Sequence, residues 1–136
     1  MRSTTLTTLS AITTLALAGT ALAADMTAAE LKALLSGKTT YAEATTASTV
    51  GQAGQVIIFW AEDGSMVYKA PDGKVIAGKW EVKDNTACFE LTTRPGMACS
   101  RYDKQGDVVS VFDGKSGALR AKITKTAAGN AEKLAP

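Results

Sequence analysis

Turn signals recur along most of this chain, and they constrain its fold more than any other feature. From residue 38 onward, short segments rich in β-branched and aromatic residues alternate with Gly, Pro, Asn and Asp at intervals of roughly 8 to 12 residues. The strands expected from this pattern span residues 38–44, 55–61, 65–70, 74–82, 86–92, 98–102, 108–112 and 118–125. Because no helical pattern separates them, parallel βαβ units are excluded.

Seven or eight consecutive strands must hide their edges, either by closing into a small barrel or by stacking as a sandwich. Sequential up-and-down pairing favours the barrel. We therefore expect a mainly β, antiparallel meander that forms a single small domain over residues 24–136, with a polar tail at 126–136. The turns expected within it include Arg94-Pro95-Gly96-Met97, and residues 45–55 are expected to form a mobile loop.

One short helix is predicted before the strands, at about residues 28–36. Thr27 and Glu30 have the spacing of a capping box, in which each side chain accepts a hydrogen bond from the other residue's backbone amide. Leucines with helical spacing follow, and Gly37 is placed to end the helix in a left-handed conformation. We expect the leucines to cover one end of the strand assembly.

The first 23 residues have the pattern of a signal peptide. Arg2 is the only charge, a long uncharged run follows, and Ala21-Leu22-Ala23 is the small-x-small pattern that a signal peptidase recognises. Cleavage after Ala24 would put Leu22 where a small residue is needed, so cleavage after Ala23 is expected. A membrane-spanning helix is the alternative, but the run is short and contains seven threonines. The mature chain, about 113 residues, is thus expected in the periplasm or outside the cell.

Cys88 and Cys99 are the only two cysteines of the chain. An even pair in an exported protein predicts a disulfide, which in a loop this short contributes roughly 3 kcal/mol in the chain-entropy model. A redox or metal-binding thiol pair is the alternative. It lacks the Cys-x-x-Cys spacing, a third cysteine and any histidine.

The composition removes several classes of function. The chain has no histidine, the commonest general base and metal ligand, and its net charge of +2 is too small for a nucleic-acid footprint. Its serines lack the Ser-x-x-Lys and Gly-x-Ser-x-Gly settings of nucleophilic catalysis, and Asp-Gly at 63, 72 and 113 is typical of turns rather than of calcium loops. Adjacent Glu62 and Asp63 cannot converge if they lie on a strand. We therefore expect no catalytic residue, no metal and no cofactor.

Gly78-Lys79-Trp80 resembles the Gly-x-Trp signature of lipocalin-like barrels, in which the tryptophan closes one end of the barrel. The signature lies in the first strand of lipocalins, whereas here it lies in the middle of the chain. Followed by the cysteine pair, it also resembles bacterial metalloprotease inhibitors of the small-barrel type. That second match covers only about twenty residues.

A broader resemblance, over residues 31–130, is to small exported proteobacterial proteins described as a domain of unknown function. The order of the motifs carries it. They are Leu35-Ser36-Gly37-Lys38-Thr39, Asp72-Gly73, Gly78-Lys79-Trp80, Cys88-Phe89, Cys99 followed by Tyr102, and Gly129-Asn130. The proline usual after Gly-Asn is Ala131 here. The resemblance implies the fold of that family and export, and it carries no activity.

Three functions remain open. The first is a binding module for a small apolar ligand or a partner protein, with Trp60, Tyr68, Trp80 and Phe112 available for a cavity or its mouth, unless all four rings are simply core. The second is an inhibitor or accessory protein of an envelope or secreted enzyme, presenting the turn at Arg94. The third, an enzyme, would need converging acids or a Ser-Lys pair. An open, lined barrel interior favours the ligand, and a packed one favours protein partners.

Overall fold

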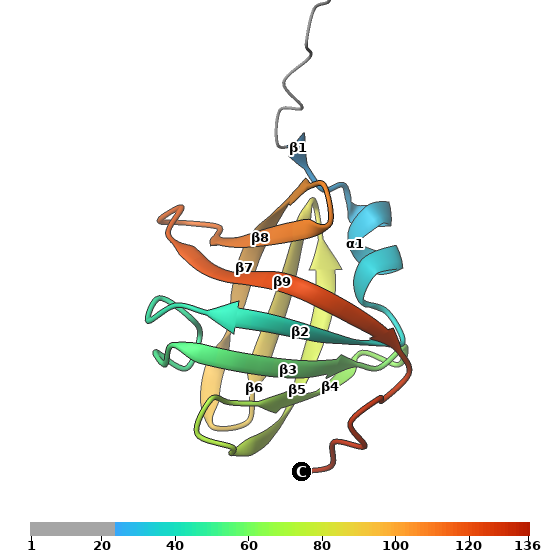
Figure 1. The fold of residues 1–136 in the computed structure, drawn as a ribbon, viewed down its shortest axis with the longest axis vertical. Helices are drawn as coiled ribbons and strands as arrows, with labels where there is room; N and C mark the ends of the chain where they lie inside the picture. Colours follow the sequence, from blue (N-terminus) through green and yellow to red (C-terminus); the bar gives the residue numbers. More distant parts are fainter. Residues whose placement is uncertain (1–23) are drawn as a thin grey trace, which may run out of the picture.

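The computed structural model describes residues 24–136, and the predicted signal peptide lies outside the described residues. Nine strands and one helix make up the fold (Figure 1). They are β1 (Ala24–Asp25), α1 (Ala28–Leu35), β2 (Lys38–Ala44), β3 (Gly54–Trp60), β4 (Ser65–Lys69), β5 (Val75–Lys83), β6 (Thr86–Leu91), β7 (Arg94–Gln105), β8 (Val108–Asp113) and β9 (Leu119–Ala128).

Strands β2 to β9 form a closed antiparallel barrel, which confirms the predicted fold class and selects the barrel over the sandwich. Each strand pairs with its neighbour in sequence, except that β2 also pairs with β9 and so closes the ring. The long strand β7 takes part in two pairings: its first half pairs with β6 and its second half pairs with β8. The short β1, which the sequence did not predict, adds to β7 at Asp103 and Lys104.

The hairpin between β6 and β7 differs from the prediction. The turn expected at residues 94–97 is wrong, because Leu91 pairs with Arg94 and the connection consists of Thr92 and Thr93. Residues 94–97 instead begin β7, next to a shift in register. Such an irregularity tolerates Pro95, which has no N–H to donate, and Gly96, whose φ is +107°.

The helix covers one end of the barrel (Figure 1). Its predicted capping box is present, with Thr27 Oγ1 and the Glu30 carboxylate each accepting the other residue's amide. Leu31 and Leu35 are fully buried in the core. Gly37 has a φ of +69° and its N–H donates to the Trp60 carbonyl, so the chain turns directly from the helix into the barrel wall.

Two tryptophans fill the barrel near this helix. The rings of Trp60 and Trp80 meet edge to face with centroids 5.5 Å apart, and each indole N–H has an acceptor, Thr40 Oγ1 and the Ala61 carbonyl respectively. Gly78 permits the approach of β6, since a Cβ there would lie 2.5 Å from the Glu90 carbonyl oxygen. This end of the barrel is therefore closed by two packed tryptophan rings whose indole N–H groups both have acceptors.

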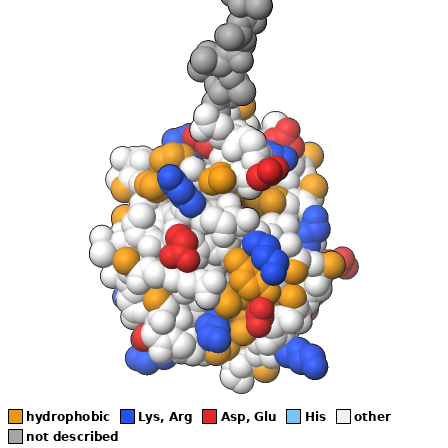
Figure 2. All heavy atoms as spheres, viewed as in Figure 1, with side chains coloured by type: hydrophobic (Ala, Val, Ile, Leu, Met, Phe, Trp, Pro, Cys, Tyr) orange, Lys and Arg blue, Asp and Glu red, His pale blue; other side chains and the backbone are white. Residues whose placement is uncertain are grey.

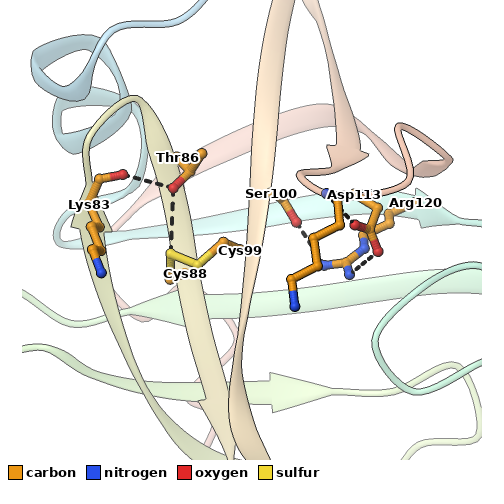
Figure 3. The surroundings of a disulfide bond; sticks show 8 residues. Lys83, Thr86, Cys88, Cys99, Ser100, Asp113 and Arg120 are labelled. Carbon is orange, nitrogen blue, oxygen red and sulfur yellow. Dashed lines mark hydrogen bonds and ion pairs between the residues drawn. A yellow bond between two sulfur atoms is a disulfide. The ribbon is translucent and has the colours of Figure 1, made fainter.

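The predicted disulfide is confirmed. Cys88 and Cys99 are direct partners across β6 and β7, bonded at an S–S distance of 2.07 Å (Figure 3). The bond joins the two strands close to the hairpin. Within residues 24–136 there is no free cysteine.

The C-terminal segment was predicted to be a polar tail from residue 126. Instead, β9 continues to Ala128 and the following residues fold back on β2, where Thr39 Oγ1 donates to the Gly129 carbonyl and accepts from the Ala131 amide. Leu134 is only 8% exposed. The buried hydroxyl of Thr39 therefore holds residues 129–131 against the barrel, although their composition predicted a solvent-exposed tail.

Charged side chains of both signs are scattered over the face shown in Figure 2, without a concentration of one sign. Over residues 24–136, no helix has the length and apolar character needed to cross a membrane.

Candidate functional site in the barrel interior

A cavity of about 50 Å³ lies inside the barrel. Its wall extends from Trp60, close to the helix, to Ser48 and Thr49 in the loop at the opposite end. Between these limits the lining is mostly apolar, with side chains from β2, β3, β8 and β9 such as Ala42, Ile58, Val111 and Ile123. The arrangement is that of a narrow apolar chamber, and we refer to its end at this loop, away from α1, as the entrance.

The size of the cavity limits what it holds without movement of its walls. A single water needs roughly 10–15 Å³ measured in this way, and a cavity of about 150 Å³ accommodates benzene. The barrel therefore has room for a few water-sized groups, and a larger molecule requires the entrance to open. The barrel interior is neither fully packed nor open.

The loop of residues 45–53 closes the entrance. Val50 is buried and belongs to the core, while Ser48 and Thr49 line the cavity. The Arg94 guanidinium holds the loop from β7, donating to the Thr49 carbonyl at 2.7 Å and to the Val50 carbonyl at 3.2 Å. The loop thus acts as a plug that one side chain from another strand fastens.

A polar cluster lies where β7, β8 and β9 meet beside the cavity (Figure 3). Arg120 donates from Nη1 to Ser100 Oγ at 2.9 Å and from Nη2 to Asp113 Oδ2 at 2.6 Å. The Arg120 side chain is 14% exposed, and its Nε is buried without a hydrogen-bond partner among the described residues. A buried guanidinium with an unused donor is unusual, because such donors normally find an acceptor.

The local field keeps the carboxylate of this cluster ionised. The backbone N–H groups of Lys115 and Ser116, followed by the Arg120 guanidinium, lower the pKa of Asp113 to about 2. Burial raises the pKa of Tyr102 well above its usual value and that of Tyr68 to about 12. At neutral pH both phenols that line the cavity are therefore neutral and able to donate.

The aromatic residues singled out from the sequence have different places. Trp60 and Tyr68 line the cavity, whereas Trp80 belongs to the packed end near the helix. Phe112 is excluded from the interior, because its neighbour Val111 faces the cavity and its own ring lies under the Arg101 guanidinium at 4.6 Å. The interpretation of Phe112 as a cavity residue is therefore wrong.

Arg94 lies at the closed entrance rather than on a protruding turn. Both terminal nitrogens of its guanidinium donate to carbonyls of the loop 45–53. The side chain that most exposes apolar surface on this hairpin is Met97, at 40%.

Sequence reasoning missed Arg120 and its partners for an identifiable reason. Strict alternation through Ala121 and Ile123, which line the cavity, would point Arg120 outward. The pairing of β8 with β9 shifts at this point: Val111 pairs with Ala121 and Phe112 with Leu119, so Arg120 is an extra residue. The bulge turns its side chain towards the barrel. Arg120 and Lys122 alternate with apolar residues as on the exposed face of a strand, so the sequence carried no signal that set Arg120 apart.

The described residues offer little for other chemistry. Over residues 24–136 no three His, Cys, Asp or Glu side chains gather in a way that could hold a metal ion. Ser65 is engaged in its own turn with Asp63, and Ser100 accepts from Arg120. The cavity and its polar cluster are the arrangement best suited to a ligand. Comparison with protein-family models, with curated proteins and with solved structures finds no match to this chain.

Proposed function

We propose that this chain is an exported, non-catalytic binding protein that takes a small apolar molecule into its barrel. The observation that carries the proposal is the cavity itself: an apolar chamber, with a few polar groups at one side, behind a loop that a single arginine fastens. Binding sites of this kind are concave and mostly apolar, with a few polar groups that fix orientation.

The plug explains how a cavity of about 50 Å³ serves a larger ligand. If the loop moved away, with Val50 leaving the core and Ser48 and Thr49 leaving the cavity wall, the cavity would open to solvent and enlarge at this end. The opposite end is held by Trp60, Trp80 and the helix, so the ligand would enter beside Arg94.

We also propose that the chain is exported. The leader expected at residues 1–23, with cleavage after Ala23, and the Cys88–Cys99 disulfide are both compatible with the periplasm or the exterior, where disulfides persist. We take the protein to be lipocalin-like in the sense that a small closed barrel holds the ligand inside rather than on its surface. We expect no nucleic-acid partner and no membrane-spanning segment after the signal peptide is removed.

A titration with an uncharged fluorescent naphthylamine tests the proposal. We expect one probe per chain of residues 24–136. Ala42→Phe should abolish binding, because Ala42 lines the cavity and the larger ring would fill it. Ala29→Phe, on the exposed part of α1, is the matched control and should bind normally. Equal binding by both variants, each shown to be folded by its thermal melt, would reject the barrel interior as the site.

A second candidate is an inhibitor or accessory protein of an envelope or secreted enzyme. It is favoured by the β6–β7 hairpin, where exposed Met97 lies two residues from Cys99 and the Glu90 carboxylate accepts from the Gly96 amide at 2.7 Å. A hairpin held this rigidly loses little freedom on binding. Recovery of one periplasmic enzyme by the native protein but not by Met97→Asp would support this function, and identical recovery would remove the hairpin from it.

A further inference from the structure

We infer that the ligand of the barrel carries a carboxylate, and that Arg120 receives it. This inference rests on the proposed function and adds the chemical class of the ligand. It starts from one unsatisfied donor at the cavity wall: among residues 24–136, the buried Nε of Arg120 has no acceptor.

Arg120 has more donors than the described residues satisfy. A guanidinium has five N–H groups, and the described residues accept from Nη1 and Nη2 only. Its Nε is buried with no acceptor. Asp113 does not remedy this, since one of its oxygens accepts from Nη2 and the other accepts from the amides of Lys115 and Ser116.

Two tyrosines supply further hydroxyl groups that can donate into the cavity, although each can also accept. Tyr68 and Tyr102 line the cavity. The pKa of each phenol is raised by burial and lowered by the charge of a nearby arginine, and neither hydroxyl forms a hydrogen bond with a described residue. The arginine is Arg94 for Tyr68 and Arg120 for Tyr102. Phenol hydroxyls and a guanidinium all donate at neutral pH.

An acceptor-only group complements this arrangement. A carboxylate has two oxygens and about four acceptor positions, and it pairs with arginine through charge-assisted hydrogen bonds. An alcohol or an amide offers fewer acceptor positions than a carboxylate and carries no charge to pair with the guanidinium. The apolar remainder of the ligand would lie against Ala42, Ile58 and Ile123, so the expected ligand is an aliphatic carboxylate.

The position of Arg120 suits recognition of one end of such a molecule. The bulge at β9 brings it to the cavity wall, and Ser100 and Asp113 orient the guanidinium from β7 and β8. Oriented in this way, it would recognise the head of the ligand while the apolar wall holds the chain.

Paired ligands of equal length test the inference. Decanoate and decanol should both bind the native protein, with decanoate at least tenfold tighter by calorimetry. Arg120→Met should remove the preference while decanol affinity stays unchanged. Lys122→Met, an exposed neighbour on β9, should keep the preference. Butyrate distinguishes the sources of the carboxylate: weaker binding than decanoate indicates that a long chain is buried too, and equal binding indicates a short acid.

A spectroscopic reading separates recognition from a purely structural role of Arg120. With ¹³C-carboxyl decanoate, the pKa of the bound acid should lie below that of the free acid in the native protein and not in Arg120→Met. Should that variant fail to fold, Tyr102→Phe removes one donor without changing the charge and should weaken decanoate alone. Equal affinities of decanoate and decanol for the native protein would overturn the inference and leave the proposed function standing. Binding of neither would overturn both.

Discussion

Arg94→Ala should loosen the plug that closes the barrel. The substitution removes two hydrogen bonds from a guanidinium, at 2.7 Å to the Thr49 carbonyl and 3.2 Å to the Val50 carbonyl. Hydrogen bonds to charged groups contribute roughly 1.5–3 kcal/mol each when shielded. Arg94 is an exposed residue, so water competes for its donors, and we expect a loss of about 1–2 kcal/mol for the pair. A loss of that size makes the open form of the loop roughly 5- to 30-fold more populated.

Native-state hydrogen exchange measures this opening. The Gly51 amide, which donates to the Ser48 carbonyl within the loop, should exchange roughly 5- to 30-fold faster in Arg94→Ala than in the native protein. The amide of Ile58, in the middle of β3, should keep its native rate. Lys74→Ala, at the same end of the barrel, is the control and should leave both rates unchanged. An unchanged Gly51 rate in Arg94→Ala would refute the assignment of Arg94 as the fastening of the plug.

Three further substitutions test the rest of the account. Replacing Cys88 and Cys99 together by alanine should lower the free energy of unfolding, measured in urea, by about 3 kcal/mol without changing the fold. Thr40→Val leaves the buried indole N–H of Trp60 without its acceptor and should lower the free energy of unfolding by about 1–3 kcal/mol. Thr40→Ser keeps the hydroxyl and should retain most of the native stability. The pKa of Asp113 is lowered to about 2 from an ordinary 3.8, so its stabilising effect is complete above about pH 4 and is lost as the pH falls through 2. The free energy of unfolding, measured by urea melts, should therefore decrease less steeply with falling pH for Asp113→Asn than for the native protein.

The fold was largely predictable because its signals are local. Turn residues between β-branched segments gave the meander, and the Thr27 and Glu30 spacing gave the helix start. Where the prediction of a turn failed, the pairing register of the hairpin decided the structure. Pro95 and Gly96 look like a turn, yet a register shift opposite β6 includes them in β7.

The candidate site was less predictable for the same reason. Trp60 and Tyr68 could be named, since large aromatic residues in strands of a small domain are usually interior. Arg120 could not, because alternation predicts the wrong face unless the bulge between β8 and β9 is known. Nor could the contacts of Arg94, because its hydrogen-bond partners lie more than forty residues earlier in the chain.

The central claim is that the ligand lies inside the barrel, and methyl-selective NMR tests it most directly. Ile57 and Ile58 are adjacent on β3, but Ile58 lines the cavity and Ile57 lies outside the core cluster, on the other face of the strand. On titration with decanol, the methyl signals of Ile58 and of Ile123, which lines the cavity from β9, should shift to saturation while those of Ile57 stay in place. Shifts confined to Ile57, or no shift of Ile58 at saturating decanol, would contradict the account.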